Sequence, residues 1–245
     1  MNVLRACCCV LALLGWGSTS AETLRLAANF WPPFTDESAL NNGVASDLVT
    51  TALARAGYAS QYEEVPWERA VRFLQRGEFD GLVGAWFSEE RALYGHFSKP
   101  YLINRIRLLQ RKGRGIQFRR LSDLYPYRIA VGRGYAYSPE FDNDPRLRKS
   151  VVGGFINAAR MLSRGRVDLT LEDELVARYY FSRELRDIRD QLEFLPQPLS
   201  ESSLHLLVRR SHPDHQRIVE AFDQAIAAMH ADGSYAEIFR RHGLQ

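Results

Sequence analysis

The sequence contains very little cysteine, and all of it lies in one place. Its three cysteines, Cys7, Cys8 and Cys9, are consecutive and fall within an apolar run from Ala6 to Trp16. If this leading segment is removed, the rest of the chain has no cysteine. That excludes disulfides, thiol catalysis and cysteine metal sites from the folded protein.

The first 21 residues are typical of a secretory signal peptide. A single positive residue, Arg5, precedes the apolar run, which is too short to span a membrane convincingly. Thr19 and Ala21 place small residues where signal peptidase cuts, so we expect cleavage near Ala21 and an exported protein. Because the cysteines open the apolar run rather than end it, the pattern favours soluble export over a lipid anchor.

The chain also lacks blocks of one charge, short-period repeats and low-complexity tracts. Its 245 residues are 46% hydrophobic and 25% charged, with a formal net charge of +3. This composition is globular, and the length suits one large domain or two lobes of about 100 residues each. The small net charge and the interleaved signs of charge argue against a nucleic-acid partner.

Motifs for catalysis and for cofactors are mostly missing. The stretch "GRGYAYS" begins like a dinucleotide-binding loop, but Tyr137 stands where the third glycine belongs. No P-loop, no G-x-S-x-G and no H-E-x-x-H occurs. His212 and His215 lie close together, but a solvated helix start explains them more simply than a metal site. We therefore expect no cofactor and no metal.

The chain does alternate strand-like and helix-like segments, which predicts an α/β fold with mainly parallel sheets. In the predicted helix at 46–57, Ser46 or Asp47 is the expected N-cap and Gly57 the C-cap. Gly-, Pro- and Ser-rich segments at 110–115 and 196–203 are expected to join two similar halves. Strands are predicted at 23–29, 61–65, 79–86, 127–134, 167–174, 192–195 and 203–210, and further helices at 66–77, 155–165, 175–185 and 215–233.

Charged residues follow two of the predicted strands, at the edge where open α/β sheets build ligand crevices. "GAWFSEER" brings Ser88 and Arg91 after one strand, and an arginine can hold a carboxylate with two parallel hydrogen bonds. A surface arginine paired with Glu89 or Glu90 is the plainer alternative. "VDLTLEDE" places Glu172 and Asp173 at another strand end. Because side chains alternate along a strand, only one of that pair should enter the crevice.

An ordered set of short motifs covers essentially all of the chain after the leader. The set is "WPPF", "GVASDLV", "PWERAVRFLQRGEFDGLVGAW", "SEER", "FSKPY", "RIAVGRG", "GRVDLTLEDE" and "DGSYAEIFRRHG". It resembles the family 3 extracellular solute-binding proteins, which capture polar amino acids for bacterial ABC importers. The resemblance implies a monomeric binding protein, not an enzyme, with a small-molecule ligand and an ABC permease as partners.

The resemblance also implies a type II periplasmic-binding fold, in which two αβ lobes enclose the ligand and are joined by two hinge crossings. Lobe 1 would comprise residues 22–110 and 199–245, and lobe 2 residues 111–198. By position, Arg91 matches the family's carboxylate-binding arginine and Asp173 its ammonium-binding aspartate. Trp31 matches the aromatic that covers the ligand, and Trp67 falls on a second wall. Prolines after Trp31 stiffen its turn, which reduces the entropy lost on binding.

Two stretches depart from the family's pattern. Hydroxyl residues usually stand between the third strand and the arginine, but here Gly84 and Trp86 occupy that stretch and Ser88 alone carries a hydroxyl. In lobe 2 the family's "GTT"-like turn becomes "GYA", which puts Tyr135 at the expected ligand wall. Two alternatives therefore stay open: a cyclohexadienyl dehydratase-like enzyme on the same fold, with Glu172 as its acid, and a soluble ligand sensor.

Overall fold

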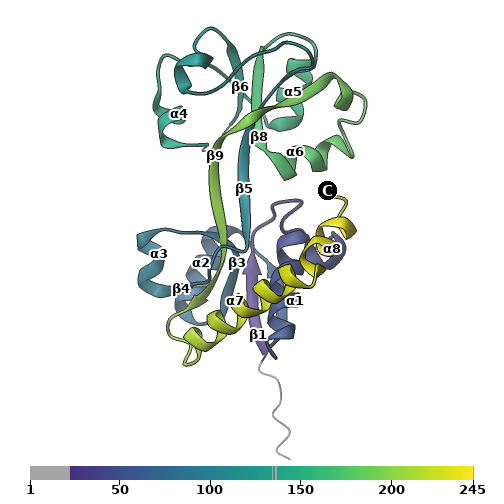
Figure 1. The fold of residues 1–245 in the computed structure, drawn as a ribbon. Helices are drawn as coiled ribbons and strands as arrows, with labels where there is room; N and C mark the ends of the chain where they lie inside the picture. The colour runs from purple at the N-terminus through teal and green to yellow at the C-terminus, as the bar shows by residue number, and fades with distance from the viewer. Residues whose placement is uncertain (1–22, 134, 136, 245) are drawn as a thin grey trace, which may run out of the picture.

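Two αβ lobes lie end to end, joined by two long strands (Figure 1). The computed structural model describes residues 23–133, 135 and 137–244, so the predicted signal peptide lies outside it. Lobe 1 contains β1 (Thr23–Ala28), α1 (Val44–Arg55), β2 (Ala59–Glu64), α2 (Trp67–Arg76), β3 (Gly81–Trp86), α3 (Glu89–Tyr94), β4 (Gly95–Phe97), α7 (His215–Ala231) and α8 (Ser234–Arg241). Lobe 2 contains β6 (Arg128–Gly132), α4 (Pro139–Asn143), β7 (Arg148–Val152), α5 (Phe155–Ser163), β8 (Leu169–Asp173) and α6 (Glu174–Phe181).

The predicted α/β class and the two-lobed type II fold are confirmed. In lobe 1, β1 pairs in parallel with β2 and β3, and in lobe 2, β6 pairs in parallel with β7 and β8. The strand order is β2-β1-β3-β9-β5-β8-β6-β7, with β4 against β9. Parallel strands point their carboxyl ends the same way, so each lobe presents one loop edge toward the other lobe.

The two connecting strands are β5 (Leu102–Arg111) and β9 (Leu192–Arg209), an antiparallel pair that runs through both lobes. The sequence predicted separate strands at 192–195 and 203–210 with a loop between them, and it did not predict β5. The structure instead has one continuous strand there. Pro198 lies opposite Arg107, where the register shifts, and such an irregularity lets a ladder accommodate a proline.

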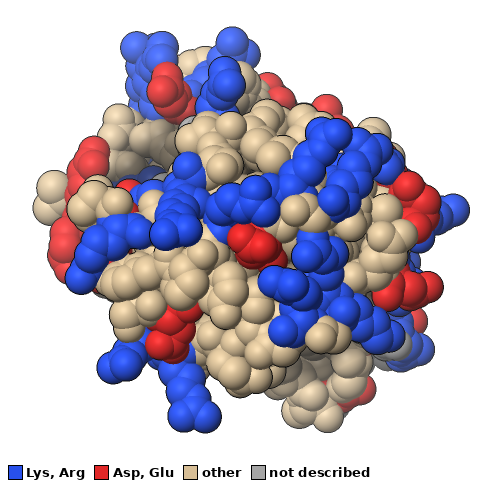
Figure 2. All heavy atoms as spheres, turned by 90° about the horizontal axis from the view of Figure 1, so that it is seen from above, with Lys and Arg blue, Asp and Glu red and all other residues tan. Residues whose placement is uncertain are grey.

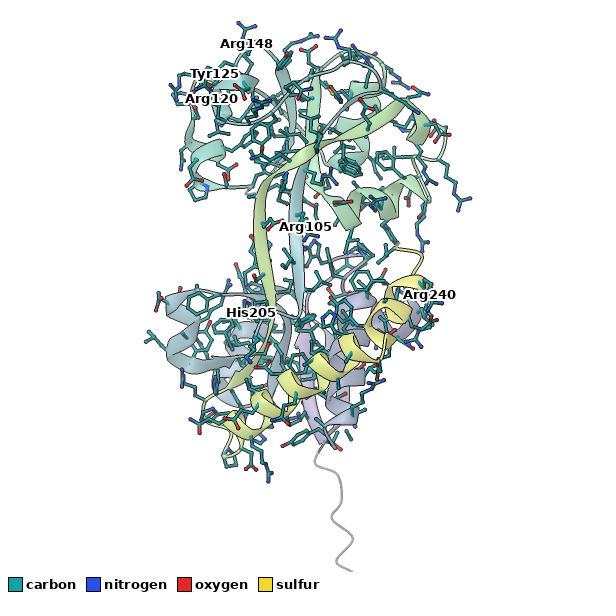
Figure 3. All side chains as sticks on the ribbon, in the orientation of Figure 1. Arg105, Arg120, Tyr125, Arg148, His205 and Arg240 are labelled. Carbon is teal, nitrogen blue, oxygen red and sulfur yellow. The ribbon has the colours of Figure 1, made fainter. Side chains whose placement is uncertain are left out.

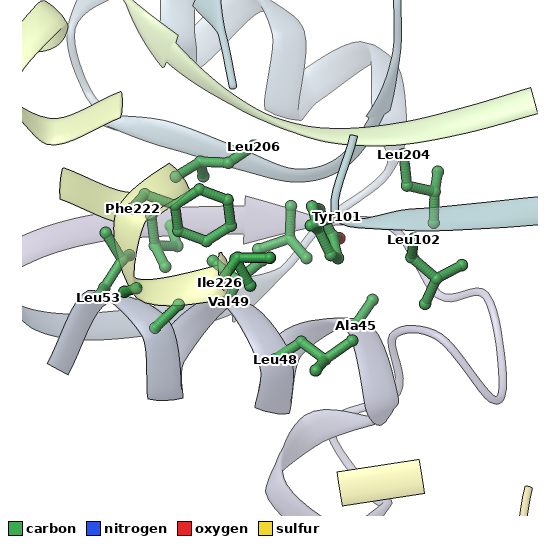
Figure 4. Close-up of a cluster of buried hydrophobic side chains, with 14 of the residues drawn as sticks. Ala45, Leu48, Val49, Leu53, Tyr101, Leu102, Leu204, Leu206, Phe222 and Ile226 are labelled. Carbon is green, nitrogen blue, oxygen red and sulfur yellow. The ribbon is translucent and has the colours of Figure 1, made fainter. Parts of the chain in front are cut away.

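The largest buried cluster lies in lobe 1, where α1 and α7 cover one face of the sheet (Figure 4). Leu48 and Leu53 of α1 meet Phe222 and Ile226 of α7 there. α2 covers the opposite face with a smaller cluster that includes Leu74. Burial on both faces explains why the central strands β1 and β3 are apolar along most of their length, whereas β2 at the edge of the sheet is mostly polar.

The start of α1 differs from the prediction. Its N-cap is Gly43 rather than Ser46 or Asp47, both of which are buried inside the helix. The amides of Val44 and Ala45 donate to the carbonyls of Pro33 and Phe34 at 2.9 Å, so the proline turn satisfies the first helical N–H groups. Asp47 instead accepts from His242 and Arg241, near the C-terminus.

Candidate functional site

The turn that carries Trp31 is built by backbone and side-chain hydrogen bonds. The Trp31 amide donates to the Thr35 carbonyl at 2.8 Å, the Thr35 amide donates back at 3.0 Å, and Thr35 Oγ1 donates to the Asn29 carbonyl at 2.6 Å. The Trp31 ring lies 4.4 Å from the fully buried Phe34 ring. The turn and the Phe34 ring therefore hold Trp31 in place, and the Trp31 side chain remains partly exposed.

Trp86 ends β3 beside the Trp31 turn, with ring centroids 6.0 Å apart in an edge-to-face arrangement. It remains 41% exposed. Two residues earlier, Gly84 has φ of +71°, and the β3–β9 register shifts between Leu82 and Ala85. Glycine adopts this backbone conformation without steric cost. The register shift bends the end of β3, and this bend helps to orient Trp86.

Arg91 lies in the first turn of α3. Ser88 caps that helix by accepting from the Arg91 amide at 3.2 Å, so its hydroxyl is already used inside lobe 1. Arg91 Nη1 donates to the Trp86 carbonyl at 2.7 Å, and the guanidinium lies 5.1 Å from the Trp67 ring centroid. Arg91 is half-buried and makes no ion pair with any described carboxylate, Glu89 and Glu90 included.

Asp173 ends β8 and caps α6. Its Oδ1 accepts from the amides of Leu175 at 2.8 Å and Val176 at 3.1 Å, and its Oδ2 accepts from the Arg105 amide and from Asn104 Nδ2, both at 3.1 Å. The side chain is buried, and burial raises its pKa to about 6 although these four hydrogen bonds oppose the rise. The carboxylate is fixed by helix, hinge and backbone together.

Asn104, in the hinge strand β5, was not singled out by the sequence. Besides donating to Asp173, it accepts from Trp86 Nε1 at 3.1 Å, and it is 1% exposed. One amide therefore connects the lobe 1 group around Trp86 with Asp173 of lobe 2. A lone asparagine within an apolar strand pattern was the available signal, because a buried amide needs partners.

Glu172 is buried beside Asp173 and accepts from the Asp173 amide at 2.9 Å. Burial raises the pKa of Glu172 to about 8, and the Asp173 charge adds to this rise. Partial burial of Tyr135 and the nearby charge of Glu172 together raise the pKa of the Tyr135 phenol to about 12. Both acidic side chains are thus buried, and that only one of them enters the crevice stays a prediction.

The structure gathers most of the predicted residues into one group. The Trp86 ring contacts Trp31, and the Trp86 carbonyl accepts from Arg91, whose guanidinium lies against the Trp67 ring. Asn104 extends these contacts from Trp86 to Asp173. Tyr135 lies apart: it is 50% exposed and stacks on Tyr137, with centroids 6.1 Å apart. Its neighbours Gly134 and Ala136, which complete the predicted "GYA" turn, lie outside the described residues.

A groove of about 470 Å³ opens beside the hinge, between α6 and the C-terminal helices. Asp173 is the one predicted site residue among its lining, which includes Tyr101, Arg105, Arg178 and Tyr235. Figure 3 places Arg105 beside the two hinge strands. The groove therefore reaches the lobe 2 carboxylate, and none of Trp31, Trp67 and Trp86 is among its lining.

Comparison with solved structures shows the class of fold, that of the type II periplasmic-binding proteins. The unliganded, open L-cystine solute receptor of Neisseria gonorrhoeae has a TM-score of 0.74 at 18% identity, covering 90% of this chain and 92% of that one. An ancestral cationic amino acid solute-binding protein (AncCDT-1) has a TM-score of 0.71 at 23% identity, covering 91% and 96%.

The chain belongs to the bacterial extracellular solute-binding proteins, family 3, whose profile matches residues 25–245. It is 24% identical over 239 residues to ABC transporter arginine-binding protein 1 of Escherichia coli strain K12, covering 94% of each protein. It is also 24% identical over 215 residues to the L-cystine-binding protein TcyJ of the same strain, covering 83% of this chain and 76% of TcyJ. None of the helices in the described residues has the length and apolar character to cross a membrane.

Proposed function

We propose that this chain captures an α-amino acid between its lobes and delivers it to an ABC permease. The observation that carries the proposal is that Arg91 is held in place without an acidic partner in the described part of the chain. It is half-buried and braced by the Trp86 carbonyl and the Trp67 ring, yet it has no carboxylate partner among the described residues. A guanidinium has five N–H donors, so donors remain for the carboxylate of a ligand.

Asp173 supplies the opposite charge in this proposal. Four N–H groups fix its carboxylate before any ligand arrives, which limits the ordering that binding requires. Since burial raises its pKa only to about 6, the group is mostly ionised at neutral pH. A ligand ammonium near it would favour the ionised form further and lower that pKa.

The three tryptophans point to the kind of side chain that fits. The Trp67 ring lies against the Arg91 guanidinium, and the Trp31 and Trp86 rings contact each other beside it, where the Trp86 carbonyl accepts from Arg91. Aromatic faces of this kind bind aliphatic stems and cationic heads. The relatives named for arginine and L-cystine bind amino acids with long polar side chains. We propose that class of ligand for this chain, and closure of the lobes about β5 and β9 when it binds.

A thermal-shift screen of the purified protein against the standard amino acids, cystine and ornithine tests the proposal. A ligand that binds the folded state raises the melting temperature in proportion to the logarithm of its concentration over Kd. We expect at least one long polar amino acid to raise it. If no amino acid does so at millimolar concentration, the proposal is wrong.

We also propose that the ligand is released unchanged. The observation that favours the enzyme alternative is Glu172, which is buried with a pKa of about 8 and so carries a proton at neutral pH, as a general acid must. Chromatography of the recovered ligand separates the two. Conversion of a prephenate-like substrate by the protein, lost in Glu172→Gln, would establish the enzyme instead.

Export completes the proposed function. We propose that residues 1–21 direct the chain to the periplasm and are removed, and that the mature protein acts as a monomer that meets its permease there. The family's extracellular placement supports this proposal.

A further inference from the structure

The far end of lobe 2 gathers arginines from segments that are distant in the sequence. β6, β7 and β8 are parallel, and β8 ends toward the hinge at Asp173, so their starts lie at the opposite end of the lobe. Arg128 and Arg148 begin β6 and β7 and are register partners. Like charges placed directly opposite on neighbouring strands are destabilising. The arrangement therefore works against stability.

Hydrogen bonds place further arginines beside this pair. Arg128 Nη2 donates to the Gly165 carbonyl at 3.4 Å, which places the pair beside the turn that carries Arg164 and Arg166. Arg111 Nη1 donates to the Leu162 carbonyl at 3.3 Å, at the end of α5 just before that turn. The six arginines of this region are called the distal arginine face: Arg111, Arg114, Arg128, Arg148, Arg164 and Arg166.

A single carboxylate lies within ion-pair distance of the distal arginine face in the described part of the chain. Asp168 Oδ2 is 3.4 Å from Arg128 Nε, and its Oδ1 is 3.9 Å from Arg114 Nη2. Arg148, Arg164 and Arg166 are exposed and make no ion pair or side-chain hydrogen bond with the described residues. The face therefore keeps a clear excess of positive charge.

The excess extends over the whole lobe. Residues 111–198 carry 17 Lys and Arg against 12 Asp and Glu, whereas residues 22–110 and 199–245 together carry 14 against 17. Figure 2 looks down on the lobe 2 end and shows Lys and Arg side chains spread across it, with fewer acidic ones between them. Figure 3 places Arg148 at this end. The small net charge of the chain is therefore unevenly distributed, with an excess of basic residues in lobe 2 and an excess of acidic residues in lobe 1.

We propose that the distal arginine face binds the anionic headgroups of a membrane surface. Guanidinium groups match phosphate with paired hydrogen bonds, and clusters of four to eight basic residues are the usual footprint for anionic lipid. A protein partner is less well matched, because protein interfaces centre on exposed aromatic or apolar anchors. On β6, β7 and β8 the exposed large apolar side chain is Val151, three residues along β7 from Arg148 toward the hinge.

Vesicle flotation tests the proposal directly. The purified protein is mixed at low salt with vesicles of phosphatidylcholine alone or of phosphatidylcholine with phosphatidylglycerol. We expect flotation only with the anionic vesicles, and its loss at half-molar salt, since surface charges are then screened. Arg148→Gln/Arg164→Gln/Arg166→Gln should reduce the partition coefficient roughly tenfold or more. These side chains have no partner among the described residues, so the variant should retain the melting temperature of the parent.

Arg69→Gln/Arg72→Gln/Arg76→Gln on α2 is the matched control. It removes the same charge from three exposed arginines of lobe 1 and should bind anionic vesicles like the parent. Both variants share one N-terminus, so a retained leader cannot explain a difference between them. Equal loss in both variants, or no flotation with anionic vesicles, would overturn the proposal; in the second case an acidic protein would be the partner left to test.

Discussion

Asn104 donates a hydrogen bond to Asp173, with Nδ2 and Oδ2 3.1 Å apart, at the point where the hinge meets lobe 2. The same amide accepts from Trp86 Nε1, which belongs to lobe 1. The contact with Asp173 is shielded from water, because Asn104 and Asp173 are 1% and 3% exposed. The Asn104 side chain therefore couples Trp86 of lobe 1 to Asp173 of lobe 2, and this coupling requires both hydrogen bonds.

Asn104→Leu should therefore be costly. It keeps the approximate volume but removes the acceptor of the Trp86 indole N–H and one of the two N–H donors to Asp173 Oδ2. We expect a loss of about 2 kcal/mol or more in the free energy of unfolding. Urea denaturation measures it, with Asn143→Leu on the exposed end of α4 as the control. A loss no larger than in the control would show that the bridge contributes nothing.

Gly43 should tolerate no side chain. Its φ is +93°, and an added Cβ would lie 2.6 Å from the Phe34 carbonyl oxygen, inside the turn that positions Trp31. We expect Gly43→Ala to destabilise the protein by about 2 kcal/mol or more and to weaken ligand binding. Gly57 is the matched control, since its φ is +87° but nothing lies within 4 Å of the added Cβ.

Gly57→Ala should cost only about 1 kcal/mol, the penalty of the left-handed backbone alone. Thermal melts of the two variants provide the comparison. Equal losses would mean that the close approach to the Phe34 carbonyl does not constrain the turn.

Glu172 should make stability depend on pH. Its pKa is raised from 4.5 to about 8, so the folded state favours the protonated form. The resulting stabilisation, relative to the charged form, is complete below about pH 4.5 and is lost as the pH rises toward 8. Glu172→Gln should therefore gain stability relative to the parent between pH 5 and pH 8.5, by roughly 1–4 kcal/mol. Urea titrations at both pH values measure this, and a pH-independent difference would contradict the burial of an acid there.

Export should leave Glu22 as the first residue. Arg5, the apolar run and the small residues Thr19 and Ala21 motivate a cut after Ala21. Intact-mass spectrometry of the protein recovered from the periplasm gives the answer. A retained Met1 or a lipid on one of the cysteines would show that the leader has another role.

Much of the fold could be predicted because hydrophobic period and helix ends are local. The α2 boundaries follow from Pro66 and Gly77, and β1, β3 and β8 follow from their apolar runs. β9 was predicted as two strands because Pro196 and Pro198 are strand breakers in isolation. Pairing with β5 over its whole length overrides that local signal.

The candidate site was predictable only in part. Arg91 and Trp31 stand at strand ends that sequence alone locates, but the distance between Trp31 and Trp86 depends on how the turns pack. The role of Asn104 depends on a contact with Asp173, 69 positions away. Arg128 and Arg148 likewise become neighbours only through strand pairing, which is why an interleaved sequence of charges gave no sign of a basic face.

Calorimetric titration of Arg91→Ala is the most direct test of the central claim, that an amino acid's carboxylate binds this arginine. The ligand is the strongest one in the thermal-shift screen, with arginine and cystine tried first, and Arg72→Ala on α2 is the control. Removing one partner of a desolvated charge pair typically costs about 2–5 kcal/mol, so affinity should fall at least thirtyfold in Arg91→Ala and remain unchanged in the control. Unchanged affinity in Arg91→Ala would contradict the account and place the ligand elsewhere.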